Sequence, residues 1–345
     1  MVKPGGQGAS SSKNFARSLF SKPFKWIYEL VNIRTRERIA TIPGVLPFYR
    51  RTLKPLLIPA PTEQGVVTVS FPDFTLEIDP KDVMGDMALG KAWEPSTSYV
   101  FRQVVRPDDV VIDIGAHWGY FTLLASTLCT ESGKVYAFEP HPDNFSLLTR
   151  NIERNHRSNV VAVQRAVSDR EGAALLFDGG ASMGHSLKPT LASSGQGDSG
   201  HAPISVSSVT LDDYFAGDSV QPRLIKMDIE GAEPNALEGM QGLIKRSPQV
   251  VLITEFNPGT LDLTTSANFL KAVTALGFDI AIIDYYRDQL ELASPEETLK
   301  RLQQPETWTL VNLLCTRGPE VPERLFGTAR LEGGETRVVK GLWSE

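Results

Sequence analysis

Apolar and polar positions follow two different periods in the middle of this 345-residue chain. Residues 110–112 are a β-branched apolar run that stops at Asp113 and Gly115, and apolar residues at helical spacing follow from 120 to 128. The pattern predicts a buried strand, a tight glycine turn and a helix. Because Gly115 and Gly119 carry no Cβ, the backbone of this turn can come close to a ligand.

Six further apolar runs of strand length follow, interleaved with helical patterns at 142–155 and 264–276. They are KVYAFEP, NVVAVQRAVSD, LIKMDIEG, VVLITEF, FDIAIID and TWTLVNLLCT. Seven strands with intervening helices predict an α/β fold with a Rossmann-like sheet. GAALLF and PISVSSV indicate additional strands on either side of a Gly- and Ser-rich insert at about 181–202, which is either a lid or substrate-selecting loop or a solvated insertion.

Acidic residues stand at or directly after the ends of the predicted strands. They are Asp113, Glu139, Asp169, Asp228 with Glu230, and Glu255. If the strands are parallel, these carboxylates line the sheet edge at which open α/β folds bind ligands. Such an edge repels a pyrophosphate and suits S-adenosylmethionine, which has a sulfonium, an ammonium and a ribose diol. A nicotinamide dinucleotide is the alternative ligand, but its site requires G-x-G-x-x-G, and this turn is D-x-G-x-x-x-G.

Composition describes a globular protein of ordinary kind, with 41% hydrophobic and 22% charged residues and a net charge of -6. The two cysteines, Cys129 and Cys315, form no disulfide or zinc pattern and are expected to be lone buried thiols. No apolar run is long enough to cross a membrane, and the start of the chain lacks the apolar region of a secretory signal. We therefore expect a cytoplasmic enzyme.

Four segments are expected along the chain. Residues 1–60 form a basic, partly disordered N-terminal extension of helical and strand character, which either packs on the catalytic domain or makes peripheral contact with a membrane or an anionic partner. Residues 61–106 form a cap, 107–316 the catalytic domain, and 317–345 a polar C-terminal tail. No transmembrane segment is expected.

Five motifs, VVIDIGAHWGYFT, AFEPHPDNF, AVSD, VTLDDYF and IKMDIEGAE, occur in an order and spacing that resembles the FkbM family over residues 97–315. The resemblance implies a class I methyltransferase fold, with a mostly parallel seven-stranded sheet whose last strand is antiparallel. It also implies S-adenosylmethionine-dependent methylation, mainly of hydroxyls on sugars and secondary metabolites. His117 departs from the family, which usually has Asn there.

The resemblance further implies a donor site made of seven residues. They are Asp113, Gly115, His117, Gly119, Glu139, Ser168 and Asp169. The two glycines should line the methionine part, with Asp113 fixing the turn and His117 offering a hydrogen bond to the donor's carboxylate. Glu139 should bind the ribose hydroxyls, and Ser168 with Asp169 should contact the adenine side.

Catalysis is expected from Asp228, Glu230 and Lys226, at the end of the fourth predicted strand of the sheet, beside the methyl group. An alcohol acceptor must lose a proton, and a positioned base speeds such a step by roughly 10²–10⁴-fold. Glu233 is an alternative carboxylate that is equally suited to capping the following helix. His185, in the insert, is an outside candidate for the base.

A metal-assisted reaction is a further alternative. Asp228, Glu255 and Asn257 supply oxygen ligands that suit a hard divalent cation. Because Asn257 precedes Pro258 and is also suited to a turn, the metal is possible but not favoured, and no metal ligand is assigned.

The expected substrate is a small molecule or a glycan. A nucleic-acid acceptor is not expected, because the predicted loops at the ligand edge are not basic and lack an aromatic stacking platform. Two other functions stay open: an NAD-dependent oxidoreductase, and a non-catalytic binding module that has kept the fold.

Overall fold

The computed structural model describes residues 61–62, 65–82, 92–177, 185–187, 202–258, 261–284, 289–302, 311–318, 320–326 and 338–340. The expected extension 1–60 and most of the insert 181–202 lie outside the described residues. The chain divides into two compact units. The first is Met1–Ser70 with Ile78–Ala92 and contains β1 (Val67–Ser70); the second is Phe71–Glu77 with Trp93–Glu345 and contains every element described below, beginning with most of β2 (Thr75–Ile78).

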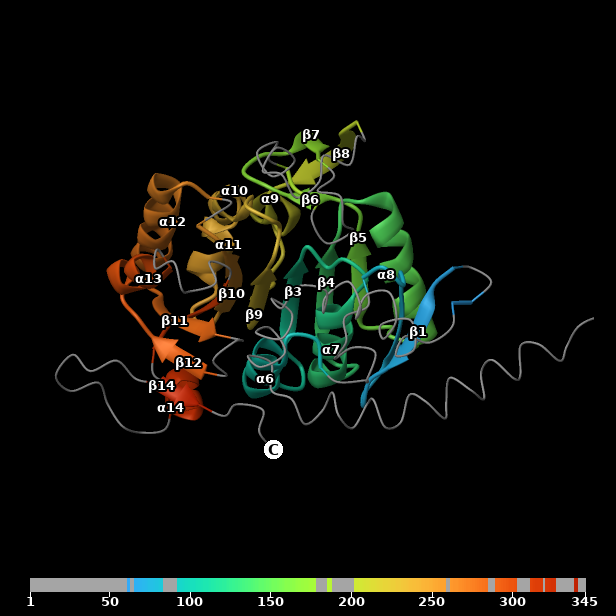
Figure 1. Cartoon of the computed structure of the whole chain (residues 1–345), viewed down its shortest axis with the longest axis horizontal. Coiled ribbons are helices and arrows are strands. Elements are labelled where there is room, and N and C mark those ends of the chain that lie inside the picture. Colours follow the sequence, from blue (N-terminus) through green and yellow to red (C-terminus); the bar gives the residue numbers. More distant parts are fainter. Residues whose placement is uncertain are drawn as a thin grey trace, which may run out of the picture. The chain divides into compact units, whose positions relative to one another are not determined.

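A nine-stranded sheet is the centre of the second unit, in the order β14-β12-β11-β13-β10-β9-β3-β4-β5 (Figure 1). Its strands are β3 (Val110–Ile114), β4 (Lys134–Phe138), β5 (Val160–Val163), β9 (Leu224–Met227), β10 (Val251–Phe256), β11 (Asp279–Asp284), β12 (Gln289–Leu292), β13 (Val311–Thr316) and β14 (Val338–Lys340). Strands β5, β4, β3, β9 and β10 pair in parallel, whereas β13 is antiparallel to both β10 and β11.

The predicted seven-stranded sheet with an antiparallel last strand is therefore confirmed. Strands β12 and β14 widen it beyond the prediction: β12 pairs with β11 on one side and with β14 on the other. They have four and three residues, which is too short for a period-two pattern to distinguish from a loop.

Helices cover both faces of the sheet. They are α6 (Pro95–Val104), α7 (Tyr120–Cys129), α8 (Pro142–Arg154), α9 (Leu211–Tyr214), α10 (Glu233–Glu238), α11 (Gln241–Arg246), α12 (Leu263–Ala275), α13 (Pro295–Leu302) and α14 (Glu320–Phe326). Phe138 packs in the large core with Leu237 of α10 and Phe269 of α12. Its neighbour Ala137 points to the opposite face and packs against Leu148 of α8. This alternation along β4 is what a strand buried on both faces requires.

A second, three-stranded sheet consists of β6 (Ala166–Val167), β8 (Ile204–Val209) and β7 (Gly172–Leu176), in that order. Figure 1 shows it beyond the carboxyl ends of β3 and β4. The extra strands expected around the insert are thus present. NVVAVQRAVSD was expected to be the third strand and its exit loop. Strand β5 ends at Val163, where the Arg165 N–H turns back to the Val163 carbonyl (3.0 Å), but the expected exit loop contains a second strand, β6, which joins the small sheet. Asp169 therefore follows β6.

The two cysteines are free and buried as expected, Cys129 at the end of α7 and Cys315 in β13. Among the helices that the structure describes, none combines the length and the apolar character needed to cross a bilayer. The segment after residue 316 contributes α14, which buries Val321 and Leu325, and the short strand β14.

Candidate active site

Four acidic residues gather at one edge of the large sheet. Ile114 pairs in parallel with both Phe138 and Met227, so the chain leaves β3, β4 and β9 at the same edge. Strand β10 runs parallel to β9 and ends beside it. The predicted row of carboxylates is therefore confirmed for Asp113, Glu139, Asp228 and Glu255. Asp169 is the exception, because it belongs to the loop that follows β6.

The glycine turn after β3 is held between the ends of β4 and β9. The N–H groups of Gly115 and Ala116 both donate to the Phe138 carbonyl, at 2.9 and 3.0 Å. Gly115 has φ +78°, and a Cβ placed on it would lie 1.9 Å from the Asp228 carbonyl oxygen. Gly119 has φ +95°, and a Cβ there would lie 2.7 Å from Leu148 Cδ1. Gly115 thus needs glycine because a Cβ would collide with the backbone of Asp228. Gly119 needs it for its left-handed φ, since the nearest atom there is the end of a flexible side chain.

Glu139 is buried, with 4% of its surface exposed, and both its oxygens accept backbone hydrogen bonds. The His141 N–H donates to Oε1 (2.8 Å) and the His117 N–H donates to Oε2 (2.9 Å). Burial raises the pKa of Glu139 to about 7, although these two N–H groups act to lower it. A carboxylate has about four acceptor positions, and the two N–H groups and a hydrogen bond from the Asn144 side chain occupy three of them, so about one remains for a ligand hydroxyl.

His117 engages Glu139 through its backbone. It has φ +51°, a left-handed conformation that few non-glycine residues adopt, and its ring lies edge-on to Trp118. Asp113 is tied to α7 by Thr122, whose hydroxyl donates to Oδ2 at 2.6 Å. The other oxygen, Oδ1, is buried without a hydrogen-bond partner in the part of the chain that the structure describes.

Ser168 and Asp169 lie on the small sheet's side of this edge. The Ser168 hydroxyl donates to Asp169 Oδ1 (3.0 Å), and its N–H donates to the Val209 carbonyl (3.0 Å). A Cβ placed on Gly239, just after α10, would lie 2.0 Å from the Ser168 carbonyl oxygen. The loop that carries Ser168 is therefore in direct backbone contact with the end of α10.

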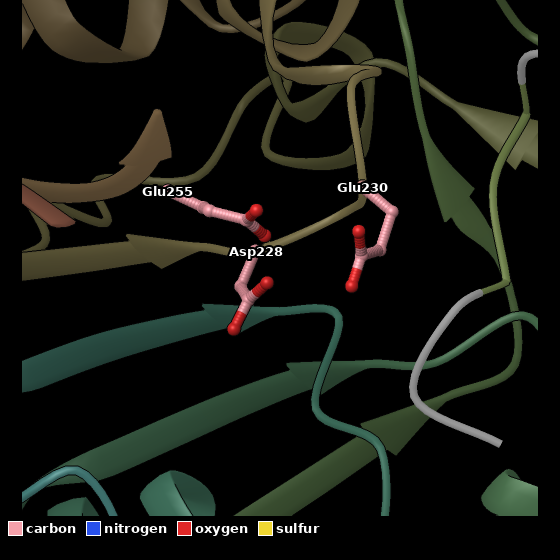
Figure 2. Close-up of side chains that lie close together, drawn as sticks. All are labelled: Asp228, Glu230 and Glu255. Atoms are coloured by element: carbon pink, nitrogen blue, oxygen red, sulfur yellow. The ribbon is translucent and has the colours of Figure 1, made fainter. Parts of the chain in front are cut away.

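Three carboxyl groups converge where β9 and β10 end. Figure 2 shows Asp228, Glu230 and Glu255 pointing toward one another, and one oxygen of each lies within 4.8 Å of the others. The buried Lys226 is beside them, with Nζ 2.9 Å from Asp228 Oδ2. The three predicted catalytic residues, Asp228, Glu230 and Lys226, are thus brought together.

The three carboxyl groups of this cluster differ in pKa because their surroundings differ. Burial opposes ionisation of Asp228, but the Lys226 ammonium and a hydrogen bond with Glu255 lower its pKa to about 2. Burial and the neighbouring Asp228 charge raise the pKa of Glu255 well above its ordinary value. The same two causes raise the pKa of Glu230 to about 8. At neutral pH Asp228 is ionised and Glu230 is close to its titration point, whereas the protonated form of Glu255, which donates to Asp228, is favoured.

Oxygen atoms at this spacing could also hold a divalent cation. Asp228 and Glu255 belong to the set considered from the sequence, whereas Glu230 is the third carboxylate of the group. Glu233 has a structural role, because its Oε1 accepts the Ile229 and Gly231 N–H groups at 3.1 and 3.2 Å. It therefore ties the loop before α10 and does not cap the helix itself, which has no side-chain cap, so the expected capping role is wrong.

Glu94 was not predicted to be near the site. It precedes α6, accepts a hydrogen bond from Asn312 Nδ2 (2.8 Å) and interacts electrostatically with Lys226 and Asp228. Burial raises its pKa, and Lys226 opposes that rise. The local sequence shows only an acidic residue directly before a proline, Glu94-Pro95, as at Glu139-Pro140, and nothing in it places Glu94 beside Lys226.

Parallel strands flank β3, β13 is antiparallel to its neighbours, and a glycine turn and acidic strand ends lie at one edge of the sheet. This arrangement is that of a class I methyltransferase. More narrowly, residues 113–279 match the family model described as "Methyltransferase FkbM domain". This match confirms the resemblance found in the motifs.

Two curated proteins are similar to parts of the chain. One is "Hexuronic acid methyltransferase AglP" of Haloferax volcanii, 24% identical over 170 residues, which are 49% of this chain and 65% of that protein. The other is "tRNA (adenine(58)-N(1))-methyltransferase catalytic subunit TRM61" of Yarrowia lipolytica, 33% identical over 72 residues, which are 21% of this chain and 18% of that protein. The chain thus spans less than two thirds of each relative.

Among solved structures, the methyltransferase FkbM from Methylobacillus flagellatus KT has a TM-score of 0.37 at 16% identity, covering 62% of this chain and 49% of that one. Fibrillarin from Aeropyrum pernix with bound S-adenosyl-L-methionine has a TM-score of 0.36 at 10% identity, covering 75% and 86%. Similarities at these TM-scores do not indicate a function. The strand order of this chain follows from its own strand pairing.

Proposed function

We propose that this protein is an S-adenosylmethionine-dependent O-methyltransferase that acts on a hydroxyl of a sugar or a secondary metabolite. The proposal rests on three features that lie at one sheet edge within the FkbM domain. They are the Gly115 turn, the buried acceptor Glu139 and the Asp228 cluster. The first two suit a nucleoside with a free diol, and the third suits a deprotonation next to a cationic centre.

The donor, when bound, supplies a methyl group on an electrophilic sulfonium. Glu139 would accept one of its ribose hydroxyls, and the turn from Gly115 to Gly119 would line its methionine part. Ser168 and Asp169 would contact the adenine side. With no pyrophosphate to bind, the row of carboxylates favours this cation over a dinucleotide.

The residues at the end of β9 would handle the acceptor's proton. The Glu230 carboxylate would accept the hydroxyl proton while the acceptor oxygen takes the methyl group and the electrons of the carbon–sulfur bond stay with sulfur. Asp228 stays ionised beside Lys226 and adds negative potential near the sulfonium. Alignment of the two reactants supplies most of the remaining acceleration.

A divalent cation at Asp228, Glu230 and Glu255 is the alternative for the same step. It is not favoured, because Lys226 already compensates Asp228 and burial keeps Glu255 protonated. The name of the Haloferax relative supports a sugar acceptor, and the name of the Yarrowia relative makes a nucleic-acid acceptor a second outcome to be tested.

The test begins with calorimetric titration of S-adenosylhomocysteine and, separately, of NADH. We expect binding of the first only, and a loss of roughly 10- to 100-fold in affinity in Glu139→Ala, since hydrogen bonds to charged groups contribute about 1.5–3 kcal/mol. Glu238→Ala, an exposed acid in α10, is the matched control. Binding of NADH in place of the methyl-donor product would favour an oxidoreductase instead.

Transfer is then measured with radiolabelled S-adenosylmethionine and a panel of glycosides, hydroxylated small molecules and tRNA. Label on a glycoside or small-molecule oxygen supports the proposal, and label on tRNA redirects it. A protein that binds the donor and labels nothing would be a binding module.

A further inference from the structure

The Glu230 backbone is held in a conformation that needs support. Its φ of +53° is in the left-handed region, which is strained for a non-glycine residue. Gly231 follows with φ +91°. On one side of this turn Glu233 accepts the Ile229 and Gly231 N–H groups. The direction of the Glu230 side chain depends on this turn, because the Cα geometry sets where the Cβ points.

The other side of the turn is held by a residue near the start of the insert. The Ser186 hydroxyl donates to the Glu230 carbonyl oxygen at 2.6 Å, although the two residues are 44 positions apart in sequence. Ser186 is 1% exposed. We call residues His185–Leu187 the clasp.

The clasp is fixed to the small sheet by its own backbone. Ser186 exchanges two hydrogen bonds with Phe177, the residue after β7, at 2.8 and 3.0 Å. Leu187 packs against the buried cluster of Ala166, Leu176 and Val206. The Ser186 hydroxyl therefore reaches Glu230 from a stable platform.

The preceding clasp residue contacts the donor side of the site. The His185 ring stacks on His141, with 4.1 Å between the centroids and 11° between the planes. His141 begins α8, and its N–H donates to Glu139 Oε1. The three clasp residues thus contact, in order, the loop that carries Glu139, the turn at Glu230 and the core of the small sheet.

We propose that Ser186 is a positioning residue that sets the Glu230 carboxyl for proton transfer, and that His185 positions the loop that presents Glu139. The inference rests on the proposed function, in which Glu230 receives the acceptor's proton and Glu139 binds the donor's ribose. Removal of the Ser186 hydroxyl frees the Glu230 carbonyl, and a shift of about 1 Å in a catalytic group can cost about 10²-fold in rate.

The experiment compares Ser186→Ala and Ser186→Thr with Ser207→Ala, an exposed serine of the same small sheet. We expect Ser186→Ala to lower kcat by about 10- to 100-fold, with KM for S-adenosylmethionine and affinity for S-adenosylhomocysteine within about twofold of wild type. Ser186→Thr keeps the hydroxyl and should restore most of kcat. Wild-type kcat in Ser186→Ala, or an equal loss in the threonine variant, would overturn the role of Ser186.

The donor-side contact has its own readout. His185→Ala should weaken S-adenosylhomocysteine binding by about three- to tenfold, the range expected for one aromatic pair, whereas His185→Phe keeps a ring and should bind nearly as wild type. Unchanged affinity in His185→Ala overturns the role of His185. If wild type itself fails to bind, the proposed function fails; if it binds and transfers while the variants match Ser207→Ala, only the clasp inference fails.

Discussion

The Gly115 backbone lies directly against the Asp228 carbonyl, so closely that a Cβ on Gly115 would be 1.9 Å from that oxygen. The glycine turn after β3 and the acidic residue that follows β9 are therefore in van der Waals contact. One consequence is that the two halves of the proposed site are positioned by backbone atoms.

We predict that Gly115→Ala lowers the free energy of unfolding by at least about 3 kcal/mol, since it combines a backbone collision with a left-handed φ. Gly217→Ala is the matched control, because Gly217 has a similar φ of +85° but a Cβ added there would meet nothing within 4 Å. For Gly217→Ala the free energy of unfolding should fall by only about 1 kcal/mol, the cost of the left-handed φ alone. Urea unfolding of both variants measures the difference, and equal losses would show that the close contact has no energetic weight.

Glu230 should act as a base with a pH dependence of its own. Burial and the Asp228 charge raise its pKa to about 8, so activity should rise with pH through that value as the carboxylate forms. Glu230→Gln should lose about 10²- to 10⁴-fold in kcat and the rising limb with it. Steady-state kcat from below to above this pKa tests the assignment, and a variant that keeps the limb would point to another base.

Glu255 should tolerate an amide. Because it is protonated and donates to Asp228, Glu255→Gln preserves the donor and should keep activity within a few-fold, whereas Asp228→Asn removes the charge that faces Lys226 and should not. The assay is run with and without EDTA. Loss of activity in Glu255→Gln together with EDTA inhibition would favour the divalent cation.

Lys226 should be essential for stability. Its side chain is 4% exposed and pairs with Asp228 at 2.9 Å. Lys226→Met leaves Asp228 without its charge partner and should lower the free energy of unfolding by about 3 kcal/mol. This is near the lower end for a broken buried ion pair because Asp228 is partly exposed. The double variant Lys226→Met/Asp228→Asn should recover part of this in chemical denaturation. A single variant as stable as wild type would show that solvent already screens the pair.

Stability should also depend on pH in a defined direction. Burial raises the folded-state pKa of Glu139 and Glu233 to about 7 and that of Glu230 to about 8, all from an ordinary 4.5. The folded protein therefore binds more protons than the unfolded chain between about pH 4.5 and 8, so stability falls as pH rises through that window. Thermal unfolding at pH 5.5 and 8.5 should give the higher Tm at the lower pH, and an opposite order would contradict these shifts.

The sequence was sufficient for features that local pattern determines. The β-branched run before Asp113, the left-handed glycines of the turn and the acids after apolar strands all follow from period and residue type, and parallel pairing then brings Glu139 and Asp228 to one edge. What pattern could not supply were contacts between distant segments. Glu94 reaches Asn312 across 218 positions, and nothing local indicates it.

The same limit explains the small sheet. NVVAVQRAVSD has the apolar content of one strand, but the turn at Val163 sends Ala166–Val167 to pair with β8, a partner about 40 residues later. The stack of His185 on His141 and the Ser186 bond to Glu230 depend on that rearrangement. They become visible only once the return of the insert to Phe177 is known.

The contact between Gly239 and the Ser168 carbonyl constrains any redesign of the proposed adenine-side contact at Ser168. With 2.0 Å between that oxygen and the position of a Cβ, the loop has no room to retreat toward α10. A bulkier purine analogue would have to be accommodated by truncating side chains around Ser168, since the main chain behind it is already at closest packing.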